Sequence, residues 1–187
     1  FAWVSVLRRT DNTSDLEDYH DEFLRIGFEA KIHEVENLAR VSFLKGIFFR
    51  AGDTFVWGPA PSRVLKMGKS SRHPHELFPK ADFSESCWMT LAANAASYRP
   101  YASVPILRAF IARYAKEGIE PTKTDIRYMV TAASERPPLT EPLMEITERY
   151  ECSRAEVAEL EHMLLQSQPL MFLSHPLLER MAEVDYA

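Results

Sequence analysis

The residue pattern of this chain changes near residue 60, and that change constrains the fold more than any other feature. Before it, short runs of β-branched and aromatic residues predict strands at residues 1–7, 28–36, 41–49 and 54–57. After it, the spacing of apolar residues predicts helices at residues 62–67, 84–97, 103–117, 124–134, 140–150, 153–166 and 175–184. One further predicted helix, at residues 14–27, lies among the strands. The sequence therefore predicts an α+β fold.

Local signals set the bounds of these elements. Residues 14–17 and 153–156 are capping boxes, with Ser as the first cap and Glu three residues later. Gly27 suits a helix end, and Pro59 and Pro61 end the last strand. We expect strands 1–7, 28–36 and 41–50 to pair antiparallel. The predicted organisation is residues 1–58 as a small antiparallel sheet with one helix, and residues 59–187 as a mostly helical bundle.

Composition narrows the class of protein. Hydrophobic residues make up 46% of the 187 positions and charged residues 26%, which suffices for a packed core and excludes global disorder. Two cysteines are too few for a disulfide framework or a metal cluster. No run of 18 apolar residues predicts a membrane span, and no signal peptide is visible. Because the chain starts at Phe1 without Met, we expect a piece of a longer protein.

Positive charge is concentrated in one stretch of an acidic chain. Residues 40–80 carry eight Lys or Arg and two Asp or Glu, which gives +6, whereas the whole chain carries −5. Such a basic stretch predicts a contact with a polyanion. The alternative is a solvated surface that happens to be basic, and charge alone does not separate the two interpretations.

Two motifs near the start of this basic stretch suggest a family. Gly27-x3-Lys31 follows the first helix, and Phe43-Leu44-Lys45 lies in the next predicted strand. In this order they resemble the last two palm motifs of viral RNA-dependent RNA polymerases. Downstream, Trp57-Gly58-Pro59 and residues 62–70 resemble the start of the thumb in nodavirus-like polymerases. The resemblance covers residues 1–116 and implies a palm end at residues 1–58 followed by a helical thumb.

The resemblance implies a role for each of several cations. Lys31 would be catalytic, because a cation beside the leaving pyrophosphate can donate a proton and offset negative charge. Lys45 would meet the phosphates of the product strand. Arg63, Lys66 and Lys69, spaced three residues apart, would track the product duplex together with Arg72. For Lys31 the alternative is a surface Lys at a strand end, and for Lys45 it is an ordinary amphipathic hairpin. For the spaced cations that begin at Arg63 it is a solvated charged face.

The family's metal-binding Asp residues have no counterpart here. Asp11, Asp15 and Asp18 fall on a turn and a helix rather than at a strand apex. The resemblance thus implies a fragment of an RNA-directed RNA polymerase, a nucleotidyltransferase, that is inactive alone. Its Mg²⁺ or Mn²⁺ would be held outside this chain. The implied partners are RNA template and product, nucleoside triphosphates, the remaining fingers and palm, and other copies of the enzyme. The implied location is a replication complex in the host cytoplasm that is attached to a membrane through regions outside this chain.

Other interpretations stay open. The chain could be a non-enzymatic helical domain that binds nucleic acid, or a protein-interaction module built from its C-terminal helices. Residues 145–160 read like a helix-turn-helix, but the acidic second helix favours a packed pair. Tyr98 is interpreted as structural. The apolar run at residues 164–173 suits a core or a docking surface; a membrane contact is less favoured because Lys and Arg are absent nearby in sequence.

Overall fold

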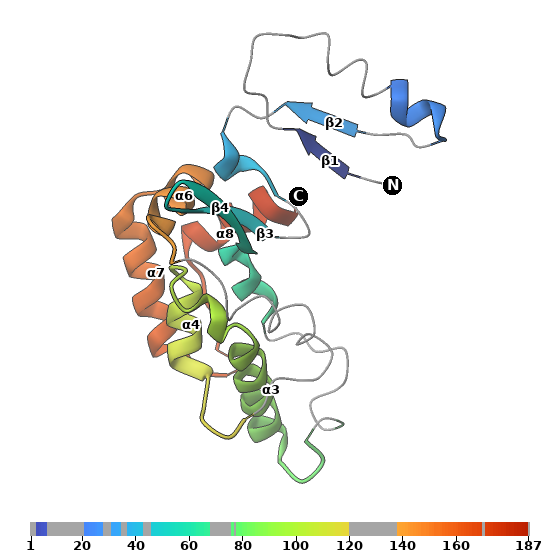
Figure 1. Cartoon of the computed structure of the whole chain (residues 1–187). Coiled ribbons are helices and arrows are strands. Elements are labelled where there is room, and N and C mark those ends of the chain that lie inside the picture. The colour runs from blue at the N-terminus through green and yellow to red at the C-terminus, as the bar shows by residue number, and fades with distance from the viewer. Residues whose placement is uncertain are drawn as a thin grey trace.

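We describe a computed structural model of the chain, and Figure 1 gives its arrangement. The described residues are 3–6, 21–27, 31–34, 37–42, 46–67, 76, 78–119, 138–169 and 171–186. The predicted helix at 124–134 and the Phe43-Leu44-Lys45 motif lie outside them. Within these ranges the chain has two small sheets and several helices, so the predicted α+β class is confirmed.

The first two strands pair parallel, not antiparallel as predicted. Strand β1 (Trp3–Val6) lies beside β2 (Lys31–Glu34), with Trp3 opposite Lys31. A helical turn at residues 21–25 lies between them in the chain, and Gly27 ends it at a φ of 84°. A hairpin turn would reverse the chain, whereas a long connection containing a helix can return it in the same direction. The predicted order strand–helix–strand is retained, and the sense of pairing is corrected.

The next sheet is a separate antiparallel hairpin. Strand β3 (Gly46–Ala51) pairs with β4 (Thr54–Pro59) through a turn at Gly52 and Asp53. The prediction that the 41–50 strand joins the first two is therefore wrong. A short 3₁₀ helix, η1 (Leu38–Arg40), precedes it, and the side chain of Asn37 caps η1 by accepting a hydrogen bond from the Ala39 amide.

Helices follow the hairpin, as the sequence predicts. They are η2 (Pro61–Lys66), α3 (Phe83–Ser97), η3 (Arg99–Tyr101), α4 (Leu107–Tyr114), α6 (Pro142–Arg149), α7 (Arg154–Gln166) and α8 (Pro176–Tyr186). The capping box at Ser153 and Glu156 forms at the start of α7. Helix α4 is shorter than the predicted helix at 103–117, because Ile106 adopts a φ of 71° that no α-helix tolerates.

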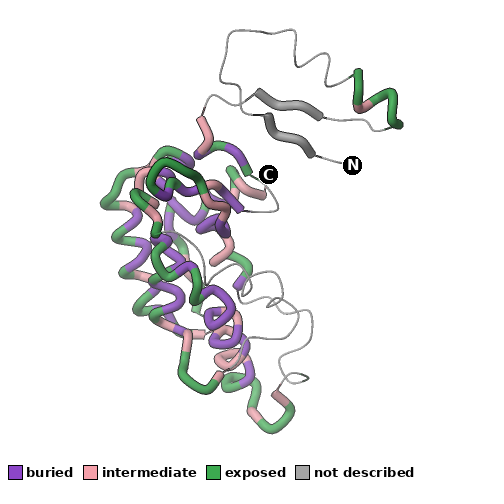
Figure 2. The backbone as a smooth tube through the Cα atoms, viewed as in Figure 1, coloured by how far each residue is buried: buried purple, intermediate pink, exposed green. Residues whose placement is uncertain are grey.

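One buried cluster joins the hairpin to the helices. Ile47 and Phe49 of β3 lie in the same core as Leu107 of α4, Leu160 of α7 and Met181 of α8. Figure 2 shows buried residues running through the middle of the helical part. The hairpin is thus held by the helices that follow it, and its position relative to η2 is fixed by this shared core.

Candidate nucleic-acid interface

The two described cations of the predicted interface lie on η2. Pro59 ends β4 and Pro61 begins η2, where its fixed φ suits the first turn. Because a 3₁₀ helix has three residues per turn, Arg63 and Lys66 lie one above the other on the same side. The third residue of the predicted alignment, Lys69, lies outside the described residues. Arg63 is half-buried and Lys66 is exposed.

Arg63 is oriented by a residue of α3. Its Nε donates a hydrogen bond of 3.1 Å to the hydroxyl of Tyr98. Tyr98 is buried in the main core at the end of α3. The structural role predicted for Tyr98 is therefore confirmed, and the structure adds that its hydroxyl fixes the guanidinium of Arg63.

Lys66 is oriented by the last helix of the described chain. Its Nζ lies 3.5 Å from the centre of the Tyr186 ring, a cation–π contact. The Tyr186 hydroxyl in turn donates to the carbonyl oxygen of Ser62, at 3.3 Å. Helix α8 therefore packs against η2 and holds its outer cation. Sequence reasoning missed Tyr186, because a contact between residues 66 and 186 leaves no local pattern.

The side chains of the other predicted site residues are not among those that the structure describes. Lys31 occupies the first position of β2, and its side chain lies outside the description. Lys45, Lys69 and Arg72 also lie outside the described residues.

The hairpin beside η2 is held at its turn end by α6 and by Thr140, which precedes this helix. The amide of Thr140 donates to the carbonyl of Arg50 at 2.8 Å, and the amide of Gly52 donates to the Thr140 hydroxyl at 2.7 Å. The amide of Arg50 donates to Glu145 at 3.0 Å. Burial raises the pKa of the Glu145 carboxyl, whose second oxygen, Oε2, has no partner among the described residues. These contacts leave the Arg50 side chain exposed, 5.8 Å from the Phe55 ring.

The acidic residues of α7 serve the fold. Glu156 completes the capping box, and the amide of Ser153 lowers the pKa of its carboxyl. Glu161 accepts a hydrogen bond from the buried amide of Ile106 at 2.8 Å and binds Arg108 through both carboxylate oxygens. This supports the prediction of a packed helical pair at residues 145–160, because the acids of its second helix are used within the molecule.

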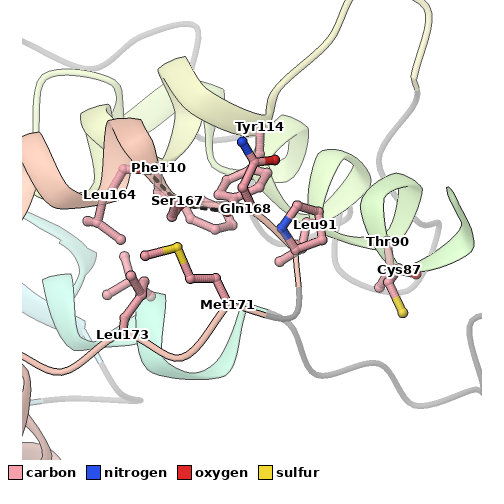
Figure 3. Close-up of a pocket in the computed structure, with 12 residues that line it drawn as sticks. Cys87, Thr90, Leu91, Phe110, Tyr114, Leu164, Ser167, Gln168, Met171 and Leu173 are labelled. Carbon is pink, nitrogen blue, oxygen red and sulfur yellow. Dashed lines mark hydrogen bonds between the residues drawn. The ribbon is translucent and has the colours of Figure 1, made fainter. Parts of the chain in front are cut away.

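A cavity of about 240 Å³ lies behind η2 (Figure 3). Its walls are mostly apolar and come from η2, α3, α4 and the segment that follows α7. The lining residues are Val64, Cys87, Thr90, Leu91, Phe110, Tyr114, Leu164, Ser167, Gln168, Pro169, Met171 and Leu173. The hydroxyls of Tyr114 and Ser167 lie 2.6 Å apart at the cavity wall. Among these lining residues there is no Asp, Glu, His, Lys or Arg, so the cavity offers no charged acid–base pair.

Within the described ranges, no three His, Cys, Asp or Glu residues lie close enough to hold a metal ion. The described helices include none that is both long and apolar enough to cross a bilayer. Comparison of the sequence with protein-family models and curated proteins, and of the structure with solved structures, finds no match. The cations of η2 and the elements that position them therefore form the candidate site.

Proposed function

We propose that this chain is the C-terminal part of a viral RNA-directed RNA polymerase, and that it positions the product strand and holds the RNA duplex. The observation that carries the proposal is the placement of Arg63 and Lys66. Both lie on one side of η2, which directly follows the β3–β4 hairpin and leads into a helical bundle. This is the order of elements that the resemblance to a palm end and thumb implies.

The geometry of η2 suits a phosphate backbone rather than base edges. Arg63 and Lys66 are each oriented by an aromatic residue from a different helix, so the charges are held in place before any ligand arrives. Preorganised cations lose less conformational entropy on binding. A-form RNA offers mainly phosphates and 2′-hydroxyls to such a surface. The chain's share of the reaction is then to bind and orient the product end.

Other parts of the proposal follow from the resemblance. Lys31 acts as the acid beside the leaving pyrophosphate, and Lys45, Lys69 and Arg72 extend the product contact. The resemblance also implies that Mg²⁺ or Mn²⁺ is held by palm residues outside this chain. The parent enzyme uses nucleoside triphosphates in a membrane-associated replication complex. The parallel β1–β2 pair departs from the antiparallel pairing expected of a palm end, so this pair does not support the proposal.

Charge reversal on η2 tests the proposal. Arg63→Glu combined with Lys66→Glu should lower the affinity of the 187-residue chain for an RNA hairpin duplex by about 100-fold, because two phosphate contacts become repulsive. Fluorescence anisotropy at fixed salt measures the change. Arg154→Glu is the matched control, since Arg154 is an exposed cation on α7 away from η2. Equal affinity of the η2 variant and the wild type would contradict the proposal.

The catalytic part needs a separate experiment in the longer parent protein. Lys31→Leu there should lower turnover by about 100-fold or more with little change in RNA affinity. Lys31→Arg keeps the charge but donates a proton poorly, so it too should lower turnover while RNA affinity stays close to that of the wild type. RNA binding by η2 in a parent without an acidic metal-binding turn would instead identify a non-enzymatic RNA-binding domain.

A further inference from the structure

One end of the helical part carries apolar side chains that are partly or largely exposed to water. Phe172 is 88% exposed, and Met171 and Leu165 are 50% and 42% exposed. All three lie within eight residues, at the end of α7 and in the segment that follows it. A phenyl ring left this open in an otherwise packed domain indicates a surface with an external partner. We refer to Leu165, Met171 and Phe172 as the apolar tip.

The structure holds this tip in a defined position. The carbonyl of Ser167 accepts a hydrogen bond from Arg113 Nε at 2.7 Å. The Ser167 hydroxyl is hydrogen-bonded to the Tyr114 hydroxyl. The amide of Met171 closes a turn by donating to Gln168 at 3.1 Å. Leu173 enters the cavity wall on the far side of the turn (Figure 3). The segment is therefore anchored before and after Phe172.

Positive charge lies next to the apolar tip in space, although not in sequence. The ends of α4 and α7 lie side by side in Figure 1, and Arg113 joins them through Ser167. Lys116 Nζ and the Arg113 guanidinium carbon lie 4.5 Å and 5.1 Å from the centre of one Trp88 ring. Arg99 donates to the carbonyl of Lys116 at 2.7 Å. Lys and Arg are therefore absent near residues 164–173 along the sequence but not in space, where Arg113 contacts Ser167.

No carboxylate among the described residues pairs with these three cations. Neither they nor the exposed Glu117 beside Lys116 takes part in an ion pair within the described ranges. Two cations that share one aromatic ring repel each other, and an external anion relieves that repulsion. Exposed apolar side chains beside Trp, Lys and Arg match the composition of protein surfaces that sit at a lipid headgroup layer.

We infer that the apolar tip and the adjacent cations Arg99, Arg113 and Lys116 form a docking surface for a bilayer containing anionic phospholipid. Phe172 and Met171 enter the boundary between headgroups and acyl chains, and the cations contact lipid phosphates. The cations alone would suit any polyanion, but the exposed Met171 and Phe172 favour a surface that offers an apolar layer behind its phosphates. This inference is independent of RNA binding by η2.

Vesicle sedimentation of the 187-residue chain tests the inference. We expect binding to phosphatidylcholine vesicles with about one third phosphatidylserine and much weaker binding to phosphatidylcholine alone. Phe172→Ser should lower partition to the anionic vesicles about 10-fold or more, because the ring no longer leaves water. Lys116→Gln should lower it about five-fold. Neither exposed side chain supports the core, so thermal unfolding should be unchanged.

Matched controls are Phe55→Ser, an exposed ring on β4, and Arg154→Gln, an exposed cation on α7. Both should bind vesicles like the wild type. In a Trp3→Phe, Trp57→Phe background, Trp88 emission should shift to shorter wavelength only with anionic vesicles. Equal partition of Phe172→Ser, or equal binding to neutral vesicles, overturns the inference. Two further results would overturn it. One is a chain that binds no vesicles and forms a dimer that Phe172→Ser dissociates. The other is a Lys116→Gln variant that loses RNA binding but keeps its vesicle binding.

Discussion

At the residue scale, one strained position stands out. Ile106 is fully buried and adopts a φ of 71°, a region that β-branched residues rarely occupy. Its amide would be unsatisfied at this bend, and Glu161 of α7 supplies the acceptor while Arg108 neutralises the carboxylate. The chain thus turns from η3 into α4 by means of a side chain 55 residues away. Local propensity could not predict this bend, because its cause is not local.

Removing that acceptor should destabilise the fold. Glu161→Ala leaves the Ile106 amide buried without a partner and should lower the free energy of unfolding by about 3 kcal/mol. Urea denaturation at neutral pH measures the loss. Glu183→Ala, at an exposed position of α8, serves as control and should change stability little. Equal stability of the two variants would show that the bend does not depend on Glu161.

Glu145 gives stability an unusual pH dependence. Burial raises the pKa of its carboxyl, so the folded state holds this proton more tightly than the unfolded chain. Its contribution is therefore complete below the unfolded pKa of about 4.3 and is lost as pH rises through the folded pKa. Because Gln does not ionise, Glu145→Gln should remove this loss of stability at higher pH. Urea denaturation at a series of pH values measures the free energy of unfolding of both proteins.

Glu156 should give stability the opposite pH dependence. The Ser153 amide and hydroxyl lower the pKa of its carboxyl, so its contribution is present above the unfolded pKa and is lost as pH falls. Glu156→Gln should therefore cost stability at neutral pH and little in acid. If Glu145→Gln and Glu156→Gln showed the same pH trend, the burial of Glu145 would not be the cause.

At the scale of elements, sequence signals predicted what is local. Two capping residues and apolar spacing located α7 closely, and the Pro59 and Pro61 pair located the change from β4 to η2. Strand partners were predicted less well, because alternation shows that a strand exists and not what lies beside it. The parallel β1–β2 pair is the clearest example. At the interface, Arg63 and Lys66 were found from spacing, whereas Tyr186 was not.

The β3–β4 hairpin should be sensitive to its first residue. A Cβ at Gly46 would meet the ring of Trp57 and the carbonyl of Gly58 closer than atoms can approach. Gly46→Ala should therefore lower the free energy of unfolding by about 2–3 kcal/mol and weaken RNA binding through η2. Gly118→Ala is the control, because its positive φ costs about 1 kcal/mol and its Cβ would meet nothing. A smaller loss for Gly46→Ala than for Gly118→Ala would refute the close approach.

At the scale of the molecule, one buried ion pair joins distant parts. Arg149 of α6 contacts Asp185 of α8, with only 3% and 7% of the two side chains exposed. The same guanidinium donates to the carbonyl of Ala39 in η1 at 3.0 Å, and Tyr150 donates to Asp185 at 2.7 Å. Asp185 precedes Tyr186, so the pair also holds the ring on which Lys66 rests.

Breaking this pair should affect both stability and RNA binding. Asp185→Ala leaves a buried guanidinium without its carboxylate and should lower the free energy of unfolding by about 3–5 kcal/mol. It should also weaken RNA binding, because the Tyr186 ring is no longer held beneath Lys66. Asp53→Ala, in the exposed hairpin turn, should change neither quantity. Thermal unfolding and anisotropy titration below the melting temperature separate the two effects.

Photo-crosslinking tests the central claim most directly. An RNA hairpin with 4-thiouridine at its 3′ end is bound to the 187-residue chain, irradiated and digested, and the crosslinked peptides are identified by mass spectrometry. The account predicts that they come from the β3–β4 hairpin and η2, and that Arg63→Glu with Lys66→Glu removes them. Crosslinks confined to α6, α7 and α8, or unchanged in that variant, would contradict it.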